Sequence, residues 1–419
     1  MSTATASKEQ AALESVPKQL YIGGEWRDGT GGETLAVEDP ATEETLVEVA
    51  DATPDDATAA LAAASDAQAE WAKHPPRERG EILRRAWEMI GEREDELALL
   101  MTLEMGKTIA ESKAEIAYAG EFFRWFAEQA VRIDGRYAVA PNGAGRLLTM
   151  KQPVGPCILI TPWNFPMAMG TRKIGPAVAA GCTMVMKPAS QTPLSMLALA
   201  RILEEAGLPG GVLNVITSSS SGSVMAPLIE DPRARKLSFT GSTEVGAKLM
   251  EQASKRVLRV SMELGGNAPF LIFDDADIDD AVAGAMIAKM RNIGEACTAA
   301  NRFHVADSIA SEFAEKLASK MGELKLGRGT DDGVDVGPLI DDDQRGKVRE
   351  LVDDARSKGA HVVVGGGQPD GRGYFYAPTV LHGVGPDARL LDEEIFGPVA
   401  PVTTFGTDEE ALAQANDTE

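Results

Sequence analysis

The chain has 419 residues, with 64 acidic and 41 basic side chains and a formal net charge of −23. This negative excess argues against binding to nucleic acids or to anionic membrane surfaces, because both require a basic protein surface. Hydrophobic residues make up 44% of the sequence and charged residues 25%, which is the balance of an ordinary globular protein. A chain of this length is expected to divide into two or more domains.

Compartment, metal binding and membrane association are constrained by a few residue types. Three cysteines without a paired spacing indicate a reducing, cytoplasmic compartment. The four histidines have no metal-ligand spacing, so no metal site is predicted. The sequence contains no uninterrupted run of about 18 apolar residues, so no membrane-spanning helix is predicted. Residues 1–19 lack the apolar segment of a secretory signal and are predicted to form a flexible tail.

The first part of the chain is predicted to be mainly helical. A short strand at 20–26 is followed, from residue 54 to residue 133, by apolar residues at helical spacing. The pair Pro75-Pro76 separates two of these helices. Residues 136–151 contain two short extended runs around a glycine-rich turn, which predicts a β-hairpin.

After residue 156 strands and helices alternate. Short apolar strands are predicted at 157–161, 183–187, 212–216, 236–240 and 257–262, with helices at 166–180, 193–206, 224–229 and 243–254. This alternation indicates a parallel sheet covered on both faces, with ligands binding at the carboxyl ends of its strands. A second α/β unit is predicted from the strand 270–273, the helix 278–290 and the strand 302–305, continuing with helices from Ser308 and Gln344 and strands near Val362 and Val380.

Two of the predicted strand ends carry polar residues suited to a nucleotide or an oxyanion. The segment 161–166, Thr-Pro-Trp-Asn-Phe-Pro, has two prolines that favour an extended turn at the sheet edge. There the amide of Asn164 could donate to an oxyanion, although a structural turn explains the pattern equally well. In the segment 187–190, Lys-Pro-Ala-Ser, Lys187 could bond ribose hydroxyls and Ser190 would tolerate a 2′-phosphate. A surface lysine with Ser190 as a helix cap is the structural alternative.

A third strand end lies at 239–246, Phe-Thr-Gly-Ser-Thr-Glu-Val-Gly. Backbone N–H groups after Gly241 and Ser242 would suit a pyrophosphate at the start of a helix. The six-residue G-x-G-x-x-G fingerprint is absent, so a simple capped helix remains the main alternative.

Glu263 and Cys297 are candidates for catalysis. Glu263 ends a predicted strand before Leu264-Gly265-Gly266, and burial among apolar neighbours would make its carboxylate a stronger base. A structural role before a glycine turn is the alternative. Cys297 lies among small and polar residues just past a helix, whereas Cys157 and Cys182 lie in apolar segments. An exposed thiol of this kind is a candidate nucleophile.

Arg172 and Arg291 are candidates for substrate binding. Arg172 lies on the helix after Asn164, and Arg291 lies six residues before Cys297. Two guanidinium groups could together bind a carboxylate. Ordinary surface salt bridges are the alternative for both.

Taken together and in this order, the motifs resemble the aldehyde dehydrogenase superfamily from about residue 20 to the last residue. The most specific pieces are 162–166, 241–246, 263–266, the Cys297 segment and 393–398, Glu-Glu-Ile-Phe-Gly-Pro. Within the superfamily, the segments 163–166, 171–173, 187–190 and 289–292 are most similar to those of succinate-semialdehyde dehydrogenases.

The resemblance implies an aldehyde dehydrogenase-like α/β fold of two doubly wound domains with a hairpin arm. Residues 20–135 and 154–263 would form the dinucleotide-binding domain, and 136–153 the oligomerisation hairpin. Residues 264–419 would form the catalytic domain. Family members continue for several tens of residues beyond this point, so that domain is expected to be incomplete at its C-terminal end. A homodimer or homotetramer is expected if the C-terminal strand is present.

The resemblance also implies a role for each candidate residue. Cys297 would be the nucleophile, Glu263 the general base, and Asn164 with the Cys297 backbone N–H the oxyanion hole. Arg172 and Arg291, beside Cys297, would bind the substrate carboxylate. The residues implied in binding the dinucleotide are Thr161, Pro162, Trp163, Asn164, Lys187, Ala189, Ser190, Gly241, Ser242, Val245, Leu264, Glu394 and Phe396.

The implied reaction is the NAD(P)+-dependent oxidation of an aldehyde to an acid through a Cys297 thioester. Succinate semialdehyde is the expected aldehyde, and NADP is favoured over NAD because Ser190 lacks a carboxylate that would repel the 2′-phosphate. Many succinate-semialdehyde enzymes carry a second cysteine two residues after the nucleophile, where this chain has Ala299. Three alternatives remain at this stage: another semialdehyde as substrate, a non-catalytic dinucleotide-binding protein, and a cofactor-free cysteine hydrolase.

Overall fold

The computed structural model describes residues 3–418, which fold into two compact units. Unit 1 comprises Met1–Val37, Thr45–Met101 and Ser112–Glu263. Unit 2 comprises Glu38–Glu44, Thr102–Glu111 and Leu264–Glu419. The main division therefore falls after Glu263, where the sequence analysis placed it. The segments 38–44 and 102–111 were expected in the first domain but pack within unit 2.

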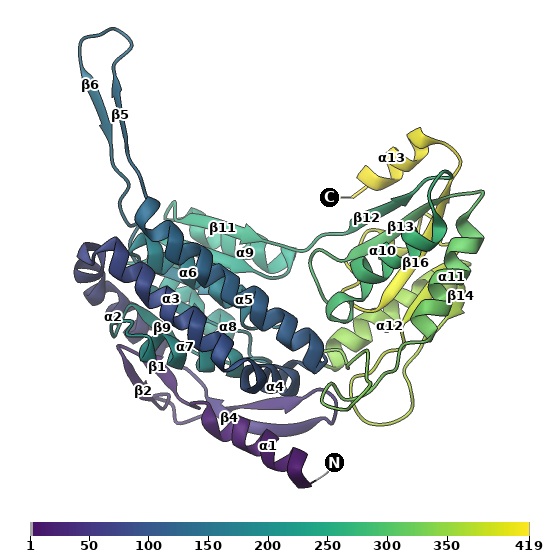
Figure 1. Ribbon diagram of the computed structural model, residues 1–419, viewed down its shortest axis with the longest axis horizontal. Coiled ribbons are helices and arrows are strands. Elements are labelled where there is room, and N and C mark those ends of the chain that lie inside the picture. The colour runs from purple at the N-terminus through teal and green to yellow at the C-terminus, as the bar shows by residue number, and fades with distance from the viewer. Residues whose placement is uncertain (1–2, 419) are drawn as a thin grey trace. The chain divides into compact units, whose positions relative to one another are not determined.

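Unit 1 is built on a seven-stranded sheet of order β11-β10-β7-β8-β9-β1-β2 (Figure 1). The strands from β7 to β11 pair in parallel, and β1 and β2 add antiparallel pairs at the other end. The bounds of these strands are β1 Leu20–Ile22, β2 Glu25–Arg27, β7 Cys157–Ile160, β8 Met184–Lys187, β9 Leu213–Val215, β10 Lys236–Thr240 and β11 Arg259–Glu263. The central strands β7, β8 and β9 are almost entirely buried, as expected for a parallel sheet covered on both faces.

Helices cover the sheet of unit 1. They are α1 Thr3–Ser15, α2 Pro54–Lys73, α3 Pro76–Glu92, α4 Glu94–Met105, α5 Ile109–Gln129, α6 Ala168–Ala180, α7 Leu194–Glu205, α8 Ser221–Glu230 and α9 Thr243–Ser254, with a 3₁₀ turn η1 Ala130–Arg132. Helix α2 contacts α8 and the strands β8 and β9, whereas α3 contacts α6 and α7. Thr53 begins α2 with a capping box closed by Asp56, which explains the start of this helix.

The expected flexible tail is wrong for most of its length. Residues 3–15 form helix α1, while residues 1 and 2 lie outside the described residues. Ala12, Leu13 and Val16 are buried against unit 1, and the hydroxyl of Ser15 donates to Glu96 Oε1 at 2.6 Å. The sequence did not indicate this helix because its apolar residues, mostly alanines, form no strong helical stripe.

Two small two-stranded sheets are separate from the main sheet of unit 1. Strands β3 (Thr34–Asp39) and β4 (Glu44–Ala50), which the sequence analysis did not predict, pair with each other. Strands β5 (Arg136–Val139) and β6 (Arg146–Thr149) form the predicted hairpin, which projects away from the rest of unit 1 (Figure 1). Its apolar side chains are largely exposed, at 67% for Tyr137, 68% for Leu148 and 72% for Met150.

Unit 2 contains a five-stranded sheet of order β12-β13-β16-β15-β14, parallel except for β14. The strands are β12 Ala268–Ile272, β13 Ala300–Ala306, β14 His361–Val364, β15 Thr379–His382 and β16 Val399–Phe405. The helices are α10 Ile278–Met290, α11 Ala310–Gly322, α12 Asp342–Ser357 and α13 Asp408–Asn416, with 3₁₀ turns η2 Arg291–Gly294 and η3 Arg389–Leu391. One core joins the sheet to α10 and α11, and a second joins it to α12, so helices cover both faces.

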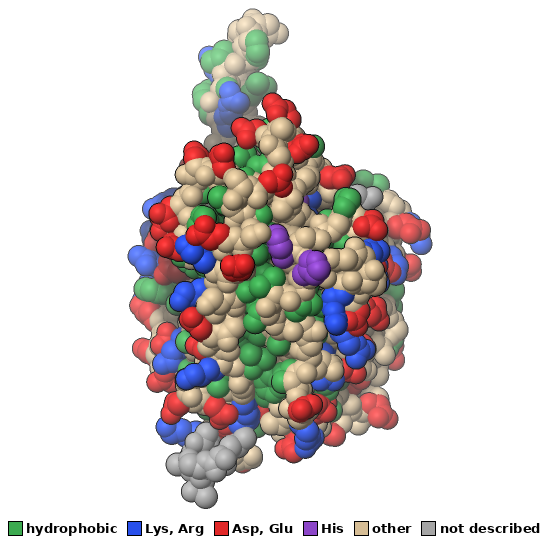
Figure 2. Space-filling view, turned by 90° about the vertical axis from the view of Figure 1, so that its right-hand side faces the viewer, with side chains coloured by type: hydrophobic (Ala, Val, Ile, Leu, Met, Phe, Trp, Pro, Cys, Tyr) green, Lys and Arg blue, Asp and Glu red, His purple; other side chains and the backbone are tan. Residues whose placement is uncertain are grey.

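The two mostly parallel sheets confirm the expected α/β fold class, with two doubly wound units and a hairpin arm. Figure 2 shows one face of the molecule, on which acidic and basic side chains are interspersed. Within residues 3–418, no helix combines the length and apolar character needed to cross a membrane. No group of three His, Cys, Asp or Glu side chains in the described residues is arranged to hold a metal ion.

Candidate active site

In unit 1, four of the sequence-predicted segments follow neighbouring strands of one sheet. Ile160 pairs with Lys187 on one side and with Phe239 on the other, and Thr240 pairs with Glu263. The strands β11, β10, β7 and β8 therefore end side by side at the same edge. This edge brings together the segments 161–166, 187–190 and 241–246 with Glu263, as expected for a parallel sheet.

The first of these segments is tightly held. Thr161 N–H donates to the carbonyl of Lys187 at 3.2 Å, and Thr161, Asn164 and Phe165 are buried, while Pro162 and Trp163 are half-buried. The helix α6 that follows has no side-chain cap of its own. Glu115 Oε1 accepts instead from the backbone N–H groups of Met167 and Ala168, at 3.0 and 3.1 Å. This buried carboxylate fixes the turn that carries Asn164.

The segment at the end of β8 contains a buried lysine. Lys187 is only 4% exposed. Burial lowers the pKa of Lys187 to about 8, against the opposing effect of Asp51. Ala189 is buried, and the half-buried Ser190 donates its hydroxyl to Gln191 Oε1 at 3.2 Å. Ser190 is not the cap of helix α7, whose N-cap is Pro193, so the structural alternative for Ser190 is wrong.

The segment at the end of β10 opens helix α9. Ser242 is the N-cap and its side chain accepts from Val245 N–H, while Gly241 N–H donates to the carbonyl of Glu263 at 3.1 Å. Ser242 and Val245 are exposed and Gly241 is half-buried. A Cβ added at Gly241 would lie 2.5 Å from the ring of Phe239, so a larger residue would have to displace that ring. The helix start is thus capped, as the structural alternative predicted, and it is also accessible, as a pyrophosphate site would require.

The expected burial of Glu263 is wrong. Glu263 is exposed, because it ends β11, which is the edge strand of the sheet, and Leu264 after it is half-buried. Which strand lies at the sheet edge depends on the pairing of distant strands, and the local sequence around Glu263 does not determine it.

A charged residue for which no role was predicted, Lys173, lies near Glu263. Lys173 on α6 is buried, and its Nζ donates to Ser238 Oγ at 2.9 Å. Burial lowers the pKa of Lys173 to about 8, and the negative charge of Glu263 acts in the opposite direction. The available signal was a lysine directly before the apolar run 174–180, within the predicted helix 166–180.

Arg172 does not form the surface salt bridge that was its structural alternative. Its Nη2 donates to the hydroxyl of Tyr118 at 2.5 Å, and its guanidinium lies 5.1 Å from the ring centroid of Phe122. It has no acidic partner in the part of the chain that the structure describes. The two aromatic residues of α5 therefore orient this cation without neutralising it.

In unit 2 the segments with the predicted nucleophile and the predicted cofactor-binding residues precede neighbouring parallel strands. Gly265-Gly266 lead into β12, Cys297 lies three residues before β13, and Glu394 and Phe396 lie just before β16. Cys297 is exposed, whereas Cys157 and Cys182 are buried. Arg291 at the end of α10 is also exposed. The amino-terminal edge of this sheet therefore brings together the thiol and the Glu394 segment.

A hydrogen-bonded chain joins Glu394 to a buried lysine that the sequence analysis did not select. Lys289 is fully buried and donates to Asn301 Oδ1 at 2.9 Å, and Asn301 Nδ2 donates to the carbonyl of Gly266 at 3.2 Å. The N–H of Gly266 in turn donates to the Glu394 carboxylate. Burial lowers the pKa of Lys289 to about 7 and raises that of Glu394. Glu394 Oε1 is buried without a hydrogen-bond partner among the described residues.

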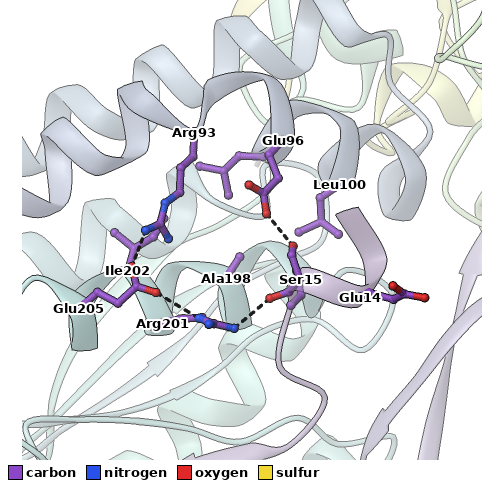
Figure 3. A pocket seen from close by; sticks show the side chains of 11 residues that line it. Glu14, Ser15, Arg93, Glu96, Leu100, Ala198, Arg201, Ile202 and Glu205 are labelled. Carbon is purple, nitrogen blue, oxygen red and sulfur yellow. Dashed lines mark hydrogen bonds and ion pairs between the residues drawn. The ribbon is translucent and has the colours of Figure 1, made fainter. Parts of the chain in front are cut away.

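A hollow of about 470 Å³ in unit 1 contains none of the predicted site residues (Figure 3). Its polar groups bond to one another: Arg201 donates to Glu205 Oε1 at 3.1 Å and to the carbonyl of Ser15 at 3.0 Å. Arg93 pairs with Glu205 as well. The hollow therefore lies where helix α1 packs against α4 and α7. Its two arginines already pair with Glu205, so neither offers a free charge to a ligand.

The fold and the two strand-edge sites define an enzyme of the aldehyde dehydrogenase class. Residues 26–419 match the aldehyde dehydrogenase family, and the chain belongs to that family. It is an NAD(P)-dependent oxidoreductase that acts on aldehydes.

Its similarity to individual proteins is high. It is 58% identical over 374 residues to the succinate-semialdehyde dehydrogenase of Paenarthrobacter nicotinovorans, covering 89% of this chain and 83% of that protein. It is 50% identical over 402 residues to the NADP(+) succinate-semialdehyde dehydrogenase GabD of Escherichia coli strain K12, covering 96% and 83%. A crystal structure of an E. coli NADP-dependent enzyme superposes with a TM-score of 0.95 at 49% identity, covering 98% of this chain and 84% of the other.

Proposed function

We propose that this aldehyde dehydrogenase oxidises succinate semialdehyde to succinate, with Cys297 as its nucleophile and NADP+ as the favoured cofactor. The observation that carries the choice of an acidic aldehyde is Arg172, a partly buried guanidinium with no acidic partner in the described residues. A carboxylate on the substrate would provide the missing counter-charge. The names of the relatives from P. nicotinovorans and E. coli support the same substrate.

Two observations indicate that the chain can hold a dinucleotide. Lys187 is a buried lysine at the end of β8, and Glu394 has a buried carboxylate oxygen without a hydrogen-bond partner among the described residues. Ribose hydroxyls carry both donors and acceptors and would satisfy these groups. Helix α9 begins with the accessible residues Gly241 and Ser242, where a pyrophosphate would be stabilised. The expected contacts of Thr161, Pro162, Trp163, Ala189, Val245, Leu264 and Phe396 belong to the same proposal.

The protein's own residues would perform the covalent and proton-transfer steps. The Cys297 thiolate adds to the aldehyde carbon, and the amide of Asn164 with the backbone N–H of Cys297 stabilises the resulting alkoxide. A bound NAD(P)+ supplies the acceptor for the hydride that leaves this carbon. Glu263 then takes a proton from the water that hydrolyses the Cys297 thioester to the acid.

Ser190 supports NADP+ over NAD+. Its side chain is half-buried, uncharged and close in sequence to Lys187, and it leaves no carboxylate at this position to repel a 2′-phosphate. The E. coli relative that is named for NADP(+) supports this preference, whereas a solved betaine aldehyde dehydrogenase of Staphylococcus aureus, at 35% identity and a TM-score of 0.94, was obtained with NAD+.

The test is a substrate panel run with NADP+ and NAD+. We expect the highest kcat/KM with succinate semialdehyde and NADP+, and a much lower value with an uncharged aldehyde of equal length. A preference for the uncharged aldehyde would refute the proposal. Ester hydrolysis that is unaffected by cofactor would favour a cysteine hydrolase, and cofactor binding without turnover would favour a non-catalytic dinucleotide-binding protein.

A five-carbon semialdehyde is the second candidate. Relatives named glutarate-semialdehyde dehydrogenase, from Pseudomonas putida and Pseudomonas aeruginosa, are 50% and 48% identical to this chain over 402 residues. An arginine clamp would bind the carboxylate of either substrate, so chain length is decided by the distance from that carboxylate to the thiol. The panel therefore includes glutarate semialdehyde alongside 3-sulfolactaldehyde, for which another relative is named.

A further inference from the structure

The segment that carries Cys297 has an unusual backbone. Asn292, Ile293 and Gly294 have φ values of 55°, 63° and 78°, all in the left-handed region. Glycine adopts this region without strain, but an asparagine does so less readily and a β-branched isoleucine is a clear outlier. A Cβ at Gly294 would lie 2.3 Å from the carbonyl oxygen of Gly397, so this residue must remain glycine. Such strain persists only where surrounding contacts hold it.

The contacts that hold the segment come from inside it and from residues far away in sequence, among them Glu111 and Ile340. Within the segment, Glu295 N–H donates to the carbonyl of Asn292 at 2.8 Å, and Asn292 Nδ2 donates to the carbonyl of Glu295 at 2.9 Å. From outside, Glu111 Oε1 accepts from the backbone N–H of Asn292 at 2.6 Å. Both Glu111 and Asn292 belong to unit 2.

Local sequence explains how Glu111 is held in place. Thr108 precedes helix α5, and its Oγ1 accepts from Glu111 N–H at 3.3 Å, while the Glu111 carboxylate receives hydrogen bonds from the N–H and hydroxyl of Thr108. This is the reciprocal pattern of a capping box. The second oxygen of the carboxylate, Oε2, is buried without a partner among the described residues. Burial raises the pKa of Glu111 and nearby Lys107 opposes that shift.

We propose that Glu111 is a positioning residue for the nucleophile: its carboxyl group holds the strained backbone at Asn292 and thereby sets the reactivity of the Cys297 thiol. The carboxyl group acts as a hydrogen-bond acceptor at a fixed reach, so side-chain length matters more than charge. Without this acceptor the Asn292 N–H loses the hydrogen bond to Glu111, and the turn relaxes away from its left-handed conformation. The inference rests on the proposed role of Cys297 as nucleophile.

The test contrasts Glu111→Asp with Glu111→Gln in the full chain. Aspartate keeps the charge and still suits the first turn of a helix, but it is one methylene too short to reach Asn292. Glutamine loses the charge but keeps a carbonyl oxygen at the original reach. The readout is the second-order rate of iodoacetamide alkylation at Cys297 without cofactor, followed by mass spectrometry of the intact protein. We expect a fall of about tenfold for Glu111→Asp and retention within about twofold for Glu111→Gln.

Three control variants separate positioning from loss of stability. Cys297→Ala reports any alkylation of the buried cysteines. Thr108→Val weakens the capping box but leaves the Glu111–Asn292 bond. Asp39→Ala removes another buried carboxylate of unit 2, which pairs with Arg328 at 2.9 Å. The last two are expected to lower the melting temperature without slowing alkylation.

An unchanged or faster alkylation rate in Glu111→Asp would overturn the inference, as would an equal fall in Glu111→Gln or Thr108→Val. Because the assay uses neither cofactor nor aldehyde, it remains informative if the proposed substrate is wrong. Conversely, succinate semialdehyde turnover by the wild type together with normal alkylation in Glu111→Asp would reject the positioning role alone.

Discussion

The thiol of Cys297 is exposed, and the two other thiols are buried in unit 1. The substitution Cys297→Ala is therefore expected to abolish both dehydrogenase turnover and thioester formation, because neither buried cysteine is accessible to an aldehyde. Turnover is measured by the appearance of reduced cofactor, and the thioester by mass spectrometry after an acid quench. Dehydrogenase activity that survived at the wild-type rate would remove Cys297 from the mechanism.

Arg172 permits a prediction about specificity. Arg172→Ala is expected to lower kcat/KM for succinate semialdehyde by about 30- to 150-fold, because it removes a charge-assisted contact of about 2–3 kcal/mol. The same substitution should change kcat/KM for an uncharged aldehyde much less. Arg124→Ala is a suitable control, since Arg124 lies over the Trp87 ring and pairs with Glu121 on the exposed face of α5. Equal losses with both aldehydes would refute the carboxylate contact.

Lys289 permits a prediction about pH. The pKa of this fully buried lysine is lowered from 10.5 to about 7 in the folded protein. Between these values the unfolded chain holds the proton and the folded chain does not, so the free energy of unfolding gains up to about 1.4 kcal/mol per pH unit from this group as the pH rises. Lys289→Met removes the contribution. Denaturant unfolding at pH 6.5, 8 and 9.5 should show a steeper rise for the wild type than for the variant, and parallel profiles would contradict the prediction.

At the scale of elements, the hairpin β5–β6 exposes apolar side chains that a solvated arm would not need. We infer that it packs on another copy of the chain, as the resemblance implied. The double substitution Tyr137→Ser with Leu148→Glu should lower the oligomeric mass measured by light scattering. Ile287→Glu, at an exposed apolar residue of α10 that is 73% accessible, provides the matched control. An unchanged mass in the hairpin variant, or an equal loss in the control, would refute the assignment.

The elements also show what the sequence could and could not predict. The alternating strands and helices from Cys157 to Glu263 were predictable because the apolar residues of each element recur at one spacing and a clear turn signal separates the elements. Helix α1 was missed because alanines and polar residues gave it no apolar stripe. The strands β3 and β4 were missed because each contains two acidic residues and neither shows a simple alternation of apolar and polar side chains. Strand β16 and helix α13 were also not predicted.

The candidate site was likewise predictable from the sequence only in part. The motif residues that directly follow a strand lie at the end of that strand, as predicted, because they are next to it in the sequence. The exposure of Glu263 depends on which strand lies at the sheet edge, and this is a property of strand order rather than of local sequence. The contact of Glu111 with Asn292 joins residues 181 positions apart, so no local pattern could have indicated it.

At the scale of the whole molecule, cofactor binding is expected to stabilise the fold. A ligand at a hundredfold excess over its Kd adds about 2.7 kcal/mol to the free energy of unfolding. We expect NADP+ to raise the melting temperature more than an equal concentration of NAD+. Ser190→Glu should reverse this order, because a carboxylate repels a 2′-phosphate and accepts from a ribose hydroxyl. Equal shifts for the two cofactors in both proteins would remove Ser190 as a determinant.

The sheet order of unit 2 has a consequence for how this part of the protein forms. Strand β16, at residues 399–405, lies between β13 and β15, at the centre of a sheet whose other strands all come earlier in the chain. During synthesis the ribosome must therefore release nearly 140 residues after Leu264 before the middle of the sheet can be filled. Until then β13 and β15 expose apolar edges with no partner between them. The high contact order predicts that unit 2 folds late and slowly, and that it is the part most dependent on protection by chaperones.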